Sequence, residues 1–294
     1  MLSLLQAEWK KTTSNRMLSG FLVWIYPVGV GAFMLMMLLV SLVSESSAQA
    51  MAATSSGQWT SDMSAIWLFI STFPGNIFGR MLPLAFMAIV FAGEYQWGTW
   101  KNLIPRSSRP ALILAKYCTL TAFIMLSLFI TSLLTAVGQA LGHSVIGAAY
   151  GPELSAANLI EFAPTYFQHA LLALISLVIL VGFAALSALL TRSILGGLLA
   201  GFGFSVVEPM SLMLFYLVGK LIARPEMINL YQYTPTYNLD NLRSWFAQQG
   251  AAAAPLAGFT AEPRMGFSVI VLAIWILGLV TLSLLIFQRQ DITG

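Results

Sequence analysis

Six long apolar runs divide this chain, and they constrain its fold more than any other feature of the sequence. A helix needs about 20 mostly apolar residues to cross the hydrocarbon core of a bilayer. Each run meets that length, and none shows the alternating pattern of a membrane β-barrel strand. The predicted spans are residues 17–44, 74–94, 111–141, 167–190, 194–218 and 266–287. The sequence therefore predicts an all-α integral membrane protein with a single transmembrane domain over residues 1–294.

The composition excludes a water-soluble protein. Only 9% of the 294 residues are charged, whereas 58% are hydrophobic. Soluble domains carry about 25% charged residues, because a surface that faces water needs them. This chain has too few charges to cover such a surface, so lipid is its expected solvent.

Basic residues flanking the spans predict that both termini are cytoplasmic. With that orientation, the inner segments hold Lys10, Lys11, Arg16, Lys101, Arg106, Arg109, Lys116, Arg192 and Arg289. The outer segments hold Lys220, Arg224, Arg243 and Arg264. The net charge of +3 then reflects topology and contact with membrane lipid, and it does not indicate nucleic-acid binding.

Two segments outside the spans are expected to lie at the membrane surface. Residues 1–16 predict an interfacial helix, whose polar face would carry Glu8, Lys10 and Lys11. An ordinary positively charged flank is the alternative. Residues 219–265 are rich in aromatic side chains, which favours an outer interfacial or re-entrant segment before the last span. Residues 45–65 are small and polar, and are expected to form an exposed outer loop.

No motif for catalysis is present. The sequence has no Walker A pattern, no zinc-binding motif and no Gly-x-Ser-x-Gly nucleophile elbow. We therefore predict no catalytic residue, no metal and no cofactor bound by this chain. His143 and His169 are expected to be interface residues, with a metal or proton role as the alternative.

The stretch between the second and third predicted spans reads EYQWGTWKNLIPRSSRPALILAK, from Glu94 to Lys116. Gly98 can end the second span, and Thr99 can cap a short helix that starts at Trp100. Pro105 should stop that helix. The stretch therefore predicts a short basic helix at the cytoplasmic surface, with a generic basic loop as the alternative.

This stretch resembles the membrane-spanning subunit of ABC-2 type ABC transporters. The matching positions are Glu94, Gly98, Thr99, Ser108, Arg109 and Lys116. The Tyr233–Asn238 run and the Arg289–Ile292 ending are also similar to that family's outer segment and tail. The resemblance implies that residues 99–105 form a coupling helix that docks on an ATPase subunit. The residues it implies for ATPase coupling are Glu94, Gly98, Thr99, Trp100, Lys101, Arg106 and Arg109.

The resemblance also implies an assembly. It would contain two permease subunits, identical or different, and separate ATPase subunits that bind ATP and magnesium. Such an assembly would export its substrate across a bacterial plasma membrane. Two other classes remain open: an ATP-independent channel or secondary carrier, and a membrane scaffold or sensing complex. The substrate is not identified by the sequence.

Two charges fall inside predicted spans. Arg80 lies 14 residues before Glu94, and Glu208 lies 14 residues after Ile194. Both are thus about 21 Å from the inner side, so an ion pair in the transport path is one hypothesis and separate solvation near the outer mouth is the other. Gly197 and Gly201 are spaced for close helix packing, either between subunits or within one subunit.

Overall fold

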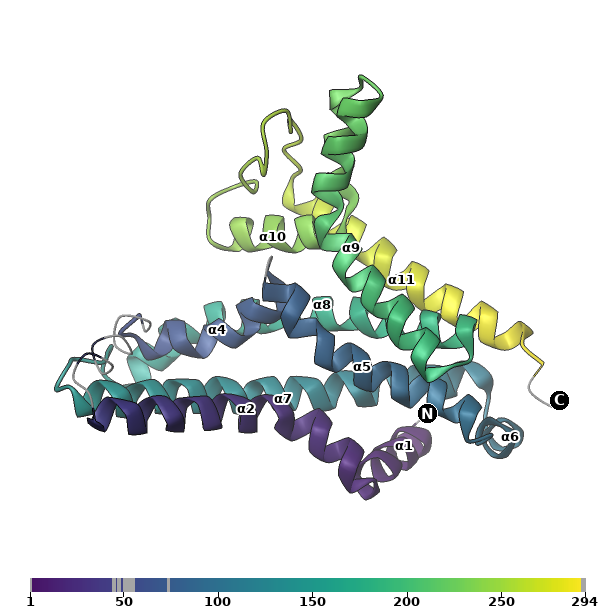
Figure 1. The fold of residues 1–294 in the computed structure, drawn as a ribbon, viewed down its shortest axis with the longest axis horizontal. Coiled ribbons are helices and arrows are strands. Elements are labelled where there is room, and N and C mark those ends of the chain that lie inside the picture. Colours follow the sequence, from purple (N-terminus) through teal and green to yellow (C-terminus); the bar gives the residue numbers. More distant parts are fainter. Residues whose placement is uncertain (1, 44–45, 47–48, 50–55, 73–74, 292–294) are drawn as a thin grey trace. The chain divides into compact units, whose positions relative to one another are not determined.

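The computed structural model describes residues 2–43, 46, 49, 56–72 and 75–291, and these residues form helices joined by loops (Figure 1). In chain order the elements are α1 (Leu2–Ser14), α2 (Arg16–Val43), α4 (Trp59–Ser71), α5 (Gly75–Gln96), α6 (Trp100–Leu103), η1 (Ile104–Arg106), α7 (Arg109–Val145), α8 (Ala156–Thr191), α9 (Ile194–Leu221), η2 (Pro225–Tyr233), α10 (Pro235–Phe246) and α11 (Met265–Arg289). The described part of the chain contains no β-strand, which confirms the all-α prediction.

Six of these helices are long and apolar enough to cross a membrane: α2, α5 from residue 77, α7, α8, α9 and α11. This number confirms the prediction. Helix α8, which contains the fourth predicted span, starts well before the predicted residue 167. Ser155 caps it, because the Ser155 hydroxyl accepts a hydrogen bond from the Asn158 N–H at 3.2 Å. The apolar run alone could not indicate this polar first turn.

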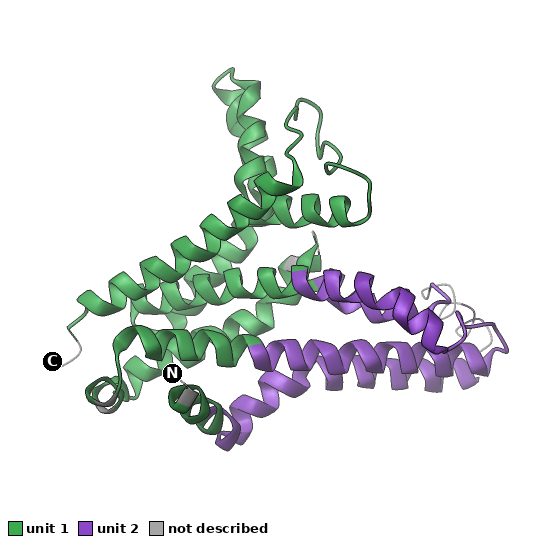
Figure 2. Ribbon diagram, turned by 180° about the vertical axis from the view of Figure 1, so that it is seen from behind, with its two compact units in different colours: residues 1–11, 70–121, 172–294 green, residues 12–69, 122–171 purple. Residues whose placement is uncertain are grey.

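The chain separates into two compact units (Figure 2). The first unit contains residues 1–11, 70–121 and 172–294, and the second contains residues 12–69 and 122–171. The prediction of a single transmembrane domain stays a prediction.

In the first unit, α8, α10 and α11 enclose an apolar core that includes Leu172, Leu239 and Leu272. The Phe183 and Phe204 rings stack at 3.6 Å, which joins α8 to α9. Helix α9 changes direction along its length (Figure 1) and contains Pro209, which removes a backbone donor. The bend agrees with the kink expected from this proline.

In the second unit, α4 packs beside the first part of α8. The Trp59 and Phe162 rings meet at 5.0 Å, and the Trp67 and Tyr166 rings meet at 5.9 Å. Because α4 starts at Trp59, the expectation of a loop through residue 65 was wrong for its last residues. Those residues turn helical where large aromatic side chains on both helices can be buried together.

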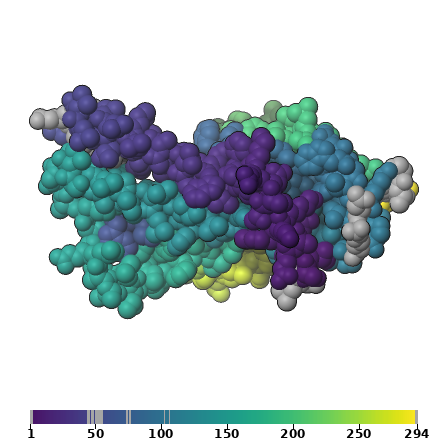
Figure 3. Space-filling view, turned by 90° about the horizontal axis from the view of Figure 1, so that it is seen from below, coloured from purple at the N-terminus to yellow at the C-terminus, as the bar shows by residue number. Residues whose placement is uncertain are grey.

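Helix α2, also in the second unit, keeps most of its apolar surface uncovered. Figure 3 shows the surface of its segment in purple, and its exposed side chains include Trp24, Phe33 and Leu39. A helix that is apolar all round and uncovered by protein suits a lipid environment.

Candidate functional site

The second membrane helix ends at a glycine turn that the sequence predicted. Gly98 has a φ of +63°, a left-handed conformation that glycine adopts without strain. The Gly98 N–H donates to the Tyr95 carbonyl at 3.2 Å, and the Thr99 N–H donates to the Glu94 carbonyl at 3.1 Å. This pair of bonds is a Schellman motif, which satisfies the last carbonyls of α5 and turns the chain into α6.

The Glu94 carboxylate is the centre of a buried charge cluster. Lys116 on α7 places its Nζ 2.7 Å from Glu94 and 3.3 Å from the Glu8 carboxylate on α1. Lys11 of α1 forms a further ion pair with Glu94. Only 1% of Lys116 is exposed, so its charge is compensated entirely inside the chain. The cluster fastens α1, the end of α5 and α7 to one another.

Two sequence expectations fail at this cluster. Thr99 does not cap α6; its hydroxyl instead donates to the Glu94 carboxylate, which is the stronger acceptor because it is charged. Glu8 does not lie on a solvent-facing side of the N-terminal helix, because its carboxylate is buried against Lys116. The buried Lys116 therefore forms ion pairs with acids of two separate helices, α1 and α5.

Trp100 anchors α6 to the rest of the first unit. Its side chain is only 1% exposed, and its ring lies 4.5 Å from the Phe287 ring at the end of α11. The Lys116 ammonium lies 5.6 Å from the Trp100 ring centre, within range of a cation–π contact. The short α6 is therefore held by tertiary contacts, since four residues could not form a stable helix alone.

Arg109 caps the end of α11. Its Nη1 donates to the carbonyls of Phe287, Gln288 and Gln290 at 2.8, 3.0 and 2.7 Å. The last carbonyls of a helix have no partner within it, and they carry a partial negative charge that a guanidinium offsets. Arg109 thus joins the start of α7 to the chain's C-terminal segment, a role that the sequence did not indicate.

Only some of the residues predicted to contact an ATPase are exposed and available to a partner. Glu94 and Trp100 are buried, whereas Lys101 is exposed and Trp97 is 64% exposed. The side chain of Arg106 lies outside the described part of the structure. A pocket of about 150 Å³ lies beside α6, and Lys101, Arg192 and Asp291 are among its lining residues. This arrangement can receive a partner's side chain.

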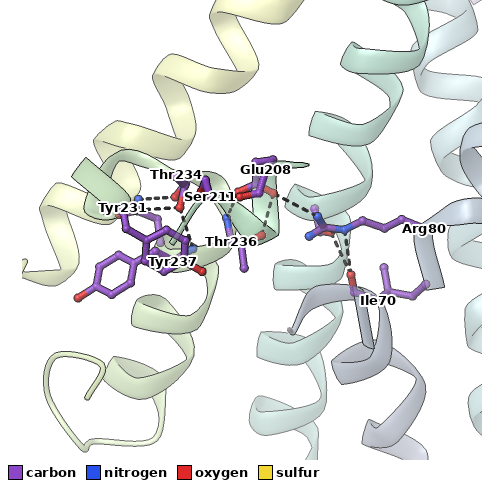
Figure 4. A network of polar contacts seen from close by, with 10 residues as sticks. Ile70, Arg80, Glu208, Ser211, Tyr231, Thr234, Thr236 and Tyr237 are labelled. Atoms are coloured by element: carbon purple, nitrogen blue, oxygen red, sulfur yellow. Dashed lines mark hydrogen bonds and ion pairs between the residues drawn. The ribbon is translucent and has the colours of Figure 1, made fainter. Parts of the chain in front are cut away.

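A second polar network lies where α5 and α9 meet (Figure 4). The Arg80 Nη1 lies 3.7 Å from the Glu208 Oε2, so the hypothesised ion pair forms within one chain. The Arg80 Nε also donates to the Ser176 hydroxyl at 3.0 Å and to the Ile70 carbonyl at 3.3 Å. A role for this pair in a transport path stays a prediction.

Glu208 also binds the segment that follows α9, which is predicted to be outer. Its carboxylate accepts hydrogen bonds from the Thr236 N–H at 2.7 Å and from the Thr236 hydroxyl at 2.8 Å. Thr236 belongs to the first turn of α10, whose N-terminus favours a negative charge. Thr234 caps the same helix and Pro235 is its first residue. Thr236 was not among the predicted site residues, although the Thr-Pro-Thr run is a signal for a helix start.

Gly197 and Gly201 make their close contacts within the chain. A Cβ on Gly197 would lie 3.1 Å from the Ala188 Cα of α8, and a Cβ on Gly201 would lie 3.3 Å from Leu84 of α5. These contacts favour the alternative of packing within one subunit. A role for either glycine between subunits stays untested.

Within the part of the chain that the structure describes, no three His, Cys, Asp or Glu side chains gather to hold a metal ion. Comparison with protein families matches residues 4–207 to the family described as "ABC-2 family transporter protein". Comparison with curated individual proteins finds no match.

Proposed function

We propose, because this chain belongs to the ABC-2 transporter family, that it is the permease subunit of an ATP-driven exporter. Its multi-pass membrane architecture and its permease role in transport follow from the family and from the six apolar helices. The dependence on ATP, the outward direction and the coupling to a separate ATPase are the proposal.

The observation that carries the proposal is the rigid attachment of α6. Trp100 is buried against α11, and the α5 residue Glu94 is bound to Lys116 of α7 and to Lys11 of α1. A force applied to the exposed Lys101 would therefore be transmitted to four helices. A coupling helix needs such an attachment, because an ATPase can drive the spans only through a segment that does not yield.

The partners and the location belong to the same proposal. ATP and magnesium would bind the ATPase subunit, and a second permease subunit would complete the path through a bacterial plasma membrane. Both termini would be cytoplasmic. In support, α1 and the end of α11 both contact the first part of α7, through Lys116 and Arg109.

A detergent pull-down of the tagged chain tests the proposal. Recovery of an ATPase with the wild type is expected, and Lys101→Glu should lower that recovery several-fold while the unfolding temperature is unchanged. Glu94→Ala should also lower recovery, but through displacement of α6. Lys220→Glu is the matched control, because it reverses an exposed lysine in the predicted outer segment.

The same experiment separates the other classes. A folded chain that purifies without an ATPase would favour the channel or carrier. An ATPase that is stimulated without movement of any substrate would favour the scaffold or sensing complex. Equal losses in Lys101→Glu and Lys220→Glu would contradict the coupling site itself.

A further inference from the structure

A groove of about 780 Å³, lined by both polar and apolar residues, lies in the second unit, along α4 and the first part of α8. Its uncharged polar lining residues include Thr60, Ser61, Ser64, Asn158 and Thr165. The volume is typical of sites for small organic molecules, which occupy about 300–1,000 Å³.

The lining of this groove is unusual for the chain that carries it. The same two helices bury aromatic side chains between them, through Trp59 with Phe162 and Trp67 with Tyr166. Hydroxyl and amide groups from both helices line the groove, together with Phe162 of this aromatic cluster. In a protein this apolar, such polar groups are costly next to lipid tails, and they are stable where water or a polar ligand covers them.

The charge around the groove has one sign. Residues 56–69 and 143–171 contain no lysine or arginine. Their charged residues are Asp62, Glu153 and Glu161. A low-dielectric surface with only acidic groups attracts cations and repels anions. By contrast, residues 219–265, in the other unit, contain both acids and bases.

Within the groove, Glu161 is the one charged residue among the described lining residues. It is exposed, and no described ion pair compensates it. Asp62, by contrast, accepts a hydrogen bond from the Tyr150 hydroxyl at 3.0 Å and is buried. The neighbouring Phe162 also lines the groove, and aromatic rings attract organic cations.

We propose that this groove binds an organic cation. Glu161 would pair with its positive charge, Phe162 would contact its apolar part, and the hydroxyl and amide groups would donate and accept hydrogen bonds. The amine headgroup of a membrane lipid and a free amphipathic cation share this chemistry. The inference goes beyond the proposed function, because it concerns a ligand site and holds whether or not ATP drives transport.

Binding of rhodamine 6G, a fluorescent organic cation, to the purified full-length chain tests the inference by fluorescence anisotropy. Saturable binding is expected for this probe and not for fluorescein, an anion. Glu161→Gln should weaken the affinity about tenfold, the order expected when a charged partner is removed. Glu153→Gln is the matched control, because it removes an acid from the same segment outside the groove lining, and its effect should stay below about twofold.

The source of the cation follows from a second set of titrations in lipid nanodiscs. Competition by phosphatidylethanolamine, relative to nanodiscs of phosphatidylglycerol alone, would support a lipid amine as the occupant. Unchanged binding that still requires Glu161 would support a free cation. Absence of saturable binding, or equal weakening by Glu161→Gln and Glu153→Gln, would overturn the inference. ATPase recovery from either variant reports separately on the proposed function.

Discussion

Arg80 and Glu208 show how a membrane chain can keep opposite charges in its interior. A charge inside a span is costly unless a partner or water compensates it. Here the Glu208 carboxylate accepts two hydrogen bonds from Thr236 and also faces Arg80. Each group therefore depends on the other, and removal of either one leaves a buried charge without its counter-ion.

A double-mutant cycle measures this dependence. Arg80→Ala and Glu208→Ala should each lower the free energy of unfolding by about 3–5 kcal/mol, the range for breaking one side of a buried pair. The double mutant should lose less than the sum, because the second substitution removes the stranded charge. Thermal unfolding in detergent gives the values.

The control for that cycle is Arg243→Ala. Arg243 lies 3.5 Å from Asp240, but its side chain is 41% exposed, so its loss should cost less than about 1 kcal/mol. Strictly additive losses in Arg80→Ala and Glu208→Ala would show that the two charges do not interact.

Asp240 makes the stability of the segment between α9 and α11 depend on pH. Burial raises the pKa of this carboxyl from 3.8 to about 6, against the opposing effect of Arg243. The native state therefore holds this proton more tightly than the unfolded chain does. Its contribution to stability is full below pH about 4 and is lost as the pH rises through about 6.

Asp240→Asn keeps the neutral form at every pH. The variant should be more stable than the wild type at pH 7.5, by on the order of 1 kcal/mol. The difference should disappear near pH 4, where both side chains are neutral. Unfolding temperatures of the two proteins at both pH values provide the comparison, and a difference independent of pH would contradict this account.

At the scale of elements, helix ends make many of the specific polar contacts of the first unit. The end of α5 is closed by the turn at Gly98, and the last carbonyls of α11 accept hydrogen bonds from Arg109. The first turn of α10 donates a hydrogen bond to the Glu208 carboxylate. Because lipid offers no hydrogen bonds, the backbone N–H and carbonyl groups that lack a partner at these helix ends must bind other groups of the protein.

Two glycine substitutions separate turn geometry from helix propensity. Gly98→Ala places a side chain at a φ of +63° and should destabilise the chain by about 1–2 kcal/mol. It should also lower ATPase recovery, because α6 follows this turn. Gly203→Ala lies within α9 with no atom near the added methyl group, and should stabilise the helix by up to about 1 kcal/mol. Loss of stability in both variants would show that the turn geometry at Gly98 is not the cause.

The sequence was informative where a local pattern determines the structure. Apolar length is sufficient to identify the six spans, and a glycine followed by threonine is sufficient to place the end of α5. Equal depth of Arg80 and Glu208 in two spans made their pairing one of two hypotheses, and the structure has the pair within one chain. The spans and the end of α5 are determined by short stretches of the chain, whereas the pairing of Arg80 with Glu208 needed a comparison of two spans.

The contacts that the sequence missed join residues far apart in the chain. Lys116 pairs with Glu8, and Arg109 donates to the carbonyls at the end of α11, because helix packing brings these residues together. The polar stripes on α4 and α8 form a groove only when these helices lie side by side, and residues 59–65 had looked like loop. Long-range proximity of this kind has no local signature.

At the scale of the whole molecule, the two ends of the chain are tied to the same helix. Glu8 binds Lys116 and Gln290 binds Arg109 through its carbonyl, so α1 and the C-terminal segment both lie at the start of α7. If all six candidate helices among the described residues cross the membrane, the two ends lie on the same side of it. The excess of basic residues in the same segments predicts that this side is the cytoplasm.

Topology reporters test this arrangement in living cells. A green fluorescent protein fused after residue 291 should fluoresce, and alkaline phosphatase fused there should be inactive, because the fusion point is predicted to be cytoplasmic. Alkaline phosphatase inserted between Gln249 and Pro255, an exposed loop between α10 and α11, should be active. A further insertion at Arg192, between α8 and α9, should again be inactive. Active phosphatase at residue 291 would reverse the orientation, and α6 would then lie where no cytoplasmic ATPase could reach it.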